Sequence, residues 1–81
     1  MIIDVRTKGE YEQGHIKGAI LHDLADMMRG VFPDVSKDEK IILYCQSGGR
    51  SMMATDLMKK AGFTNVTNGG GMSELERTLR V

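Results

Sequence analysis

The segment from Ile41 to Ser51, Ile-Ile-Leu-Tyr-Cys-Gln-Ser-Gly-Gly-Arg-Ser, constrains this chain more than any other. An apolar run ends at Cys45, the only cysteine, and is followed by a short loop with two glycines and then by an amphipathic segment. This order predicts a strand, a tight loop and a helix, which is how α/β proteins place a reactive group at the carboxyl end of a parallel sheet. Backbone N–H groups in such a loop and at the start of the helix favour negative charge.

The rest of the sequence predicts strands that alternate with helices. We expect strands at Ile2–Arg6, Ala19–Leu21, Ile41–Tyr44 and Thr64–Thr67. Three helix starts carry capping signals, which are Thr7 with Glu10, Asp23, and Ser73 with Glu76. Gly14, Gly30 and Gly62 suit helix ends, and Asn68–Gly71 reads as a tight turn. The alternation predicts an α/β fold, a small parallel β-sheet flanked by helices on both sides.

The predicted helices have apolar residues at helical spacing, which we expect to face the core. These residues are Leu24, Met27 and Met28, then Met53, Ala54, Leu57, Met58 and Ala61, and finally Leu75 and Leu79. Most of the seven methionines fall at such positions, so we interpret them as packing residues and not as a metal-binding set.

Length and charge limit the classes of function. The 81 residues predict one domain spanning 1–81, and 41% hydrophobic with 27% charged residues is typical of a globular protein. Eleven basic and eleven acidic side chains cancel, so we expect a monomer that binds neither nucleic acid nor a membrane. The N-terminus lacks a signal peptide pattern, which predicts a cytoplasmic protein, or a periplasmic bacterial one if a leader has been removed.

Cys45 is the candidate nucleophile. A lone cysteine is more often a small buried hydrophobe, but Cys45 ends a strand and precedes Gly48 and Gly49, whose backbone amides can turn inward. Arg50 adds a positive charge at a helix start, where a cation opposes the helix dipole and so requires a nearby anion. Amide dipoles and a guanidinium should both favour the thiolate. No metal site is predicted, because His15 and His22 show no metal-ligand spacing around this cysteine.

Three polar residues outside the loop have structural interpretations. We expect Arg6 to pair with Glu10, and Asp4 to accept hydrogen bonds from neighbouring backbone amides. His15 follows Gly14, and we interpret it as forming a turn hydrogen bond and not as a general base.

Three groups of motifs along the chain occur in the order expected for one protein family. The chain resembles the rhodanese superfamily over nearly its whole length and, among single-domain members, the phage shock protein E type. The residues that carry the resemblance are Asp4–Thr7, Glu10–Tyr11 and Gly14–Ala19, then Cys45–Ser51, and then Ala61–Phe63, Val66 and Gly70–Gly71. Family members have an additional strand before the first motif, so we expect unpaired backbone groups beside Ile2 and Ile3. Many also have a tryptophan where this chain has Leu75.

The resemblance implies a thiosulfate sulfurtransferase without a metal or organic cofactor. Cys45 would take the outer sulfur of thiosulfate as a persulfide, release sulfite, and pass the sulfur to cyanide or to a thiol, including one on a thioredoxin-like protein. Arg50 would pair with the sulfonate oxygens. The backbone amides that would hold the persulfide and the substrate anion belong to Gln46, Ser47, Gly48, Gly49 and Arg50.

Three alternatives remain open. A related phosphatase or arsenate reductase places its arginine one residue further from cysteine, whereas four residues separate Cys45 from Arg50 here and predict a smaller cradle. A catalytically idle module would bind a protein partner, although such modules commonly lose the cysteine. A sulfur relay would form the same persulfide from a protein donor.

Overall fold

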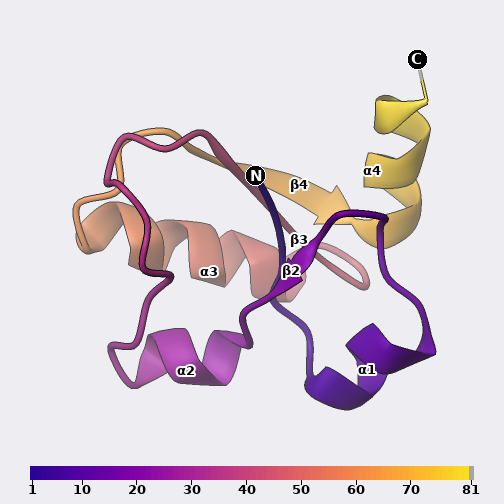
Figure 1. The fold of residues 1–81 in the computed structure, drawn as a ribbon, viewed down its shortest axis with the longest axis horizontal. Coiled ribbons are helices and arrows are strands. Elements are labelled where there is room, and N and C mark those ends of the chain that lie inside the picture. The colour runs from indigo at the N-terminus through magenta and orange to yellow at the C-terminus, as the bar shows by residue number, and fades with distance from the viewer. Residues whose placement is uncertain (81) are drawn as a thin grey trace.

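The fold is a four-stranded parallel sheet with helices on both faces, as the computed structural model of residues 1–80 describes it (Figure 1). The strands are β1 (Ile2–Asp4), β2 (Ile20–Leu21), β3 (Ile41–Cys45) and β4 (Val66–Gly71), and they lie in the order β2-β1-β3-β4. The helices are α1 (Lys8–Gln13), α2 (Leu24–Met28), α3 (Gly49–Lys60) and α4 (Met72–Leu79). The predicted α/β class is therefore confirmed.

Alternation along β3 divides the core between the two faces of the sheet. Ile41, Leu43 and Cys45 belong to a cluster that also contains buried side chains of α2 and α3. Tyr44, which lies between Leu43 and Cys45 and points to the other face, belongs to a second cluster with Leu75 of α4. Because successive side chains of a strand point to opposite faces, β3 is covered on both sides, as its unbroken apolar run predicts.

The start of α1 is fixed by the predicted capping box. The Thr7 hydroxyl accepts a hydrogen bond from the Glu10 N–H at 3.3 Å, and the Glu10 carboxylate accepts one from the Thr7 N–H at 3.2 Å. The Asp23 carboxylate accepts from the Ala25 N–H at 3.0 Å, which confirms it as the cap of α2. Both helices therefore begin where their capping residues predict.

The end of the sheet differs from the prediction. β4 runs from Val66 to Gly71, so Asn68–Gly71 is strand and not a tight turn. An added Cβ at Gly69 would lie 2.8 Å from a methyl carbon of Ile42, so glycine is required by close packing on β3. The last helix then starts at Met72, and the cap predicted from Ser73 and Glu76 is wrong, because Glu74 accepts the Gly71 N–H at 3.1 Å.

Strand β1 is interior to the sheet. Ile3 lies opposite Ile20 of β2 and also opposite Leu43 of β3, so the expectation of unpaired backbone groups is wrong for Ile3, whereas Ile2 lies opposite Ile42 of β3. The sequence predicts a strand that continues to Arg6, but β1 ends at Asp4. Leu75, at the position where many family members have tryptophan, is buried in the second core cluster.

The apolar faces were predicted only in part. Met27 and Met58 are buried, but the side chains of Met28, Met53 and Leu79 are about half exposed or more. The buried face of α3 includes the polar residues Ser51 and Thr55 together with Ala54 and Met58. Because these positions follow helical spacing, they displace Met53 to the outer side of the helix. Most methionines are therefore not core residues, and the prediction that they are packing material is wrong for the exposed ones.

Within residues 1–80, no helix combines the length and apolar character that crossing a bilayer requires.

Candidate active site

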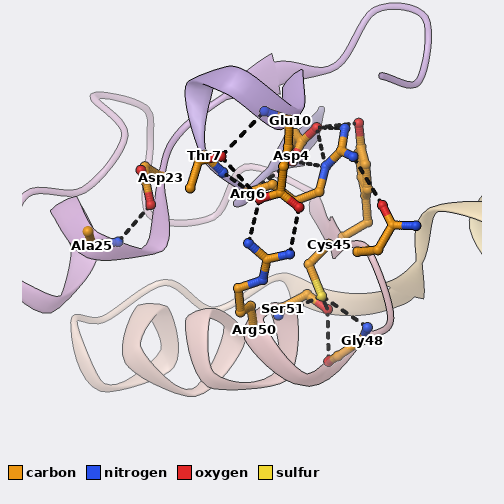
Figure 2. Close-up of polar contacts among 12 residues, drawn as sticks. Asp4, Arg6, Thr7, Glu10, Asp23, Ala25, Cys45, Gly48, Arg50 and Ser51 are labelled. Carbon is orange, nitrogen blue, oxygen red and sulfur yellow. Dashed lines mark hydrogen bonds and ion pairs between the residues drawn. The ribbon is translucent and has the colours of Figure 1, made fainter. Parts of the chain in front are cut away.

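The loop after β3 brings the candidate nucleophile against the start of α3 (Figure 2). The predicted order of strand, loop and helix is confirmed: β3 ends at Cys45, one residue beyond the predicted strand, and α3 begins at Gly49, one residue before Arg50. Between them Gly48 has a φ of 104°, a left-handed conformation that favours glycine. An added Cβ there would also lie 3.5 Å from the Gly70 Cα, so the loop packs closely on the end of β4.

The Cys45 sulfur is buried but receives hydrogen bonds. The residue is 1% exposed, and its Sγ accepts from the Gly48 N–H at 3.0 Å and from the Ser51 N–H at 3.4 Å. Burial is the largest influence on the pKa of this thiol and raises it. The hydrogen bonds from Ser51, Gly48 and Ser47 together outweigh burial and lower the pKa below its ordinary value.

Ser51 connects this sulfur to β4, and sequence reasoning missed its role. Its Oγ lies 3.6 Å from the Cys45 Sγ. The same hydroxyl is within hydrogen-bond distance of two acceptors, the Gly48 carbonyl oxygen at 3.0 Å and Asn68 Oδ1 at 2.6 Å. The Gly70 N–H donates to the same Asn68 oxygen at 2.9 Å. Ser51 is fully buried, and the only sequence signal for its role was its position in the first turn of the helix that follows the nucleophile loop.

Arg50 makes a bidentate ion pair with Glu10. Its Nη1 and Nη2 donate to the two Glu10 carboxylate oxygens at 2.7 and 2.9 Å, which joins the start of α3 to α1 (Figure 2). The predicted pairing of Glu10 with Arg6 is therefore wrong. The Arg50 guanidinium is the main reason that the pKa of Glu10 is lowered to about 2. The anion expected beside the arginine at the start of α3 is thus a carboxylate of the chain itself.

Asp4 and Arg6 form a buried cluster with Tyr44. The Arg6 Nη2 lies 2.7 Å from the Asp4 Oδ2, and the Tyr44 hydroxyl donates to the same oxygen at 2.8 Å. The Arg6 N–H donates to Asp4 Oδ1 at 2.9 Å, which confirms the backbone contact expected for this carboxylate. Arg6 also donates to the Gln46 side-chain oxygen at 3.3 Å and to the Gly14 carbonyl at 2.7 Å. Through Gln46, the cluster holds the near end of the loop.

His15 makes a local contact, in line with its structural interpretation. Its Nδ1 lies 2.8 Å from the Tyr11 carbonyl oxygen, and its ring stacks on the Tyr11 ring with centroids 3.7 Å apart. The exposed imidazole is thereby held against the end of α1.

The surface beside the loop offers room and hydrogen-bond donors. Within residues 1–80, the N–H groups of Gly49 and Arg50 at the start of α3 have no acceptor. A cleft of about 280 Å³ adjoins the loop, and Cys45 is not part of its wall. The cleft is lined by Arg6, Glu10, Gln13, Gly14, Gln46 and Met72. A small molecule could therefore approach the loop through this cleft, and the two N–H groups at the start of α3 would suit an anion.

Comparison with known proteins places this geometry in a family. A sequence profile of the rhodanese-like domain matches residues 1–78. The chain belongs to the rhodanese-like domain family. A rhodanese with anions from E. coli has the same fold, with a TM-score of 0.76 and 33% identity, and the match covers 90% of this chain and 87% of that one.

Relatives of this rhodanese-like chain differ in length and in named activity. Thiosulfate sulfurtransferase PspE of Escherichia coli (strain K12) is 33% identical over 76 residues, which are 90% of this chain and 71% of that protein. A tRNA uridine(34) hydroxylase of Enterobacter sp. (strain 638) is 39% identical over 87 aligned positions, which cover 99% of this chain and only 25% of that protein. A sulfurtransferase is thus among the relatives, and so is an enzyme with a different named activity.

Proposed function

We propose that this chain is a sulfurtransferase that moves the outer sulfur of thiosulfate to cyanide or a thiol through a persulfide on Cys45. The observation that carries the proposal is the pair of backbone N–H groups, from Gly48 and Ser51, that donate to the Cys45 sulfur. These donors stabilise an anionic sulfur, and a thiolate is the form that attacks sulfur. The similarity to PspE, a thiosulfate sulfurtransferase, supports the same reaction.

In the first displacement, the Cys45 thiolate attacks the outer sulfur of thiosulfate. The bond between the two thiosulfate sulfurs breaks, sulfite leaves with the electron pair, and the cysteine becomes a persulfide anion. The N–H groups of Gly49 and Arg50, which have no acceptor within residues 1–80, would hold the oxygens of the donor. The N–H groups of the loop would then hold the persulfide, because its outer sulfur is also negatively charged.

In the second displacement, cyanide or a thiolate attacks the outer sulfur and Cys45 leaves as the thiolate. Two displacements replace one difficult transfer between two anions, which is the advantage of nucleophilic catalysis. A thiol on a thioredoxin-like protein would serve as an acceptor in the same way, and a protein persulfide would serve as a donor.

A transfer assay tests the proposal against its rivals. With thiosulfate and cyanide, the protein should form thiocyanate and sulfite, and the Cys45→Ser variant should form neither. The arginine is separated from Cys45 by four residues, so we expect phosphate esters to fit poorly. Hydrolysis of an aryl phosphate faster than thiocyanate formation would favour the phosphatase alternative. Absence of both reactions would favour a module that binds a protein partner.

A further inference from the structure

The ion pair between Glu10 and Arg50 places a carboxylate beside the proposed donor site. Arg50 is the second residue of α3, next to the backbone N–H groups expected to hold the donor oxygens. Its side chain is 39% exposed and that of Glu10 is 33% exposed, so solvent and small anions can reach the pair. Glu10 also lines the cleft beside the loop. The positive charge that Arg50 was expected to offer to a donor is therefore already paired with the Glu10 carboxylate.

The Glu10 carboxylate is held in place from the other side. Its Oε1 accepts from the Thr7 N–H at 3.2 Å and from the Thr7 hydroxyl at 3.1 Å, while Arg50 contacts both of its oxygens. The capping box thus fixes the carboxylate on α1, whereas the Arg50 guanidinium reaches it on a long flexible side chain from α3 (Figure 2). Of the two partners, Arg50 is the one that can turn away.

A dianionic donor and the carboxylate require the same groups of Arg50. The paired nitrogens, Nη1 and Nη2, form the fork that binds a carboxylate or a sulfonate with two parallel hydrogen bonds. Both anions cannot occupy this fork at the same time. Thiosulfate would also approach a carboxylate of like charge, which opposes a dianion more than a monoanion.

We propose that Glu10 is a specificity-determining residue that competes with anionic sulfur donors for Arg50. This inference rests on the proposed function and deepens it, because it ranks donors by charge. Glu10 lowers the affinity for thiosulfate relative to donors with less negative charge. No covalent bond changes in this step: the carboxylate releases the guanidinium, and the donor oxygens take its place.

Glu10→Gln isolates the charge. Glutamine is the other residue that completes a capping box with threonine, so α1 keeps its cap. Glu12→Gln is the matched control, because Glu12 lies exposed on the same helix and has no ion-pair partner within residues 1–80. Both variants change the net charge by the same amount, so general attraction of anions is equal in the two.

The experiment measures the rate of Cys45 persulfide formation against donor concentration for two donors. One is thiosulfate, a dianion, and the other is methanethiosulfonate, a monoanion that gives up the same sulfur and leaves as methanesulfinate. Relative to Glu12→Gln, the Glu10→Gln variant should use thiosulfate about fivefold more efficiently through a lower KM, as loss of a partly exposed ion pair implies. Methanethiosulfonate should gain by a smaller factor, because the carboxylate repels a monoanion less than a dianion.

A second background shows whether Arg50 mediates the effect. In Arg50→Gln protein, adding Glu10→Gln should improve thiosulfate use by less than in protein that keeps Arg50, because the contested cation is gone and only repulsion by the carboxylate remains. Equal use of thiosulfate by Glu10→Gln and Glu12→Gln, or poorer use by Glu10→Gln, would overturn the competition while leaving the sulfurtransferase proposal intact. Absence of a persulfide in the unmodified protein with both donors would overturn the proposed function and this inference together.

Discussion

The Ser51 hydroxyl has more hydrogen-bond contacts than any other side chain at the loop, and it has only one proton to donate. That proton can go to the Gly48 carbonyl, to Asn68 or, once the thiol ionises, to the Cys45 sulfur. Asn68 Oδ1 keeps the Gly70 N–H as a partner in either case. The hydroxyl can therefore turn to the thiolate without leaving a buried acceptor unpaired.

Replacing Ser51 with alanine should raise the pKa of Cys45, because a donor to the thiolate is lost while burial remains. The rate of alkylation by iodoacetamide as a function of pH measures this change directly. We expect the midpoint to move to higher pH, together with a loss of about 1–2 kcal/mol in the free energy of unfolding. A midpoint at the same or a lower pH would show that the two N–H donors alone determine the acidity of the thiol.

Replacing Arg50 with alanine should affect thiosulfate use more than folding. The ion pair with Glu10 is partly exposed, so we expect a change of less than about 1 kcal/mol in the free energy of unfolding. The KM for thiosulfate should rise about tenfold or more, because a charged contact to the donor is lost. Steady-state kinetics with a parallel urea titration separates the two effects, and an unchanged KM would show that Arg50 does not bind the donor.

At this scale, sequence reasoning identified residues but not their partners. Cys45, Gly48 and Arg50 could be singled out because they are neighbours in one short loop. The partner of Arg50 is Glu10, forty positions away. That Glu10 pairs with Arg50 and not with Arg6 depends on how the strands are ordered in the sheet. Local patterns carry no information on such a pairing.

Among the elements, the end of β4 is the one that supports the loop. An added Cβ at Gly71 would lie 2.8 Å from the Gln46 carbonyl oxygen and 3.3 Å from the Ser47 Cα, both of them backbone atoms. Neither backbone atom can move without shifting the loop. Sequence reasoning read Asn68–Gly71 as a turn because glycine runs usually mark one, and it had no signal for this close approach.

Gly71→Ala should therefore displace the loop, lower the Tm and slow persulfide formation. Gly9→Ala is the control, since it lies within α1 with nothing within 4 Å of an added Cβ. Alanine there should stabilise the protein by about 0.5–1 kcal/mol and leave persulfide formation unchanged. Thermal unfolding and the rate of sulfur uptake are measured for both variants. A Gly71→Ala protein with an unchanged Tm and rate would contradict the supporting role of β4.

Strands and helices with strong local signals were predicted correctly, and the exceptions have a common cause. β3 and the caps of α1 and α2 depend on neighbouring residues and appear where expected. The buried face of α3 depends instead on Ser51 and Thr55, two polar residues that hydrogen-bond within the protein. Apolar spacing alone therefore assigned Met53 to the core.

For the whole molecule, two carboxylates near the carboxyl end of the sheet, Asp4 and Glu10, make the free energy of unfolding depend on pH in acid. Burial raises the pKa of Asp4, but its contacts with Arg6 and Tyr44 together lower it below the ordinary value. The pKa of Glu10 is lowered from 4.5 to about 2, chiefly by Arg50. Because both values are lower in the folded protein, the stability that they contribute is complete above the unfolded pKa and is lost as pH falls.

The free energy of unfolding of the unmodified protein should thus decrease between pH 4.5 and about pH 2. In Glu10→Gln this decrease should be less steep, since one of the two carboxylates no longer takes up a proton on unfolding. Urea titrations at a series of pH values, with Glu12→Gln for comparison, measure the difference. Identical slopes for the two variants would show that the Glu10–Arg50 pair contributes nothing to stability.

The class of the fold could be predicted because strands and helices alternate along the chain and β3 is apolar on both faces. The order β2-β1-β3-β4 could not, because it depends on pairings between distant segments. That order places β1 inside the sheet, and it brings Asp4, Arg6 and Glu10 to the same end as Cys45.

The most direct measurement is the intact mass of the protein after incubation with thiosulfate and removal of the excess. If backbone donors keep the Cys45 sulfur ionised and able to carry a second sulfur, the unmodified protein should gain the mass of one sulfur atom and the Cys45→Ser variant should gain nothing. An unchanged mass for the unmodified protein, or an equal gain in the Cys45→Ser variant, would contradict this account.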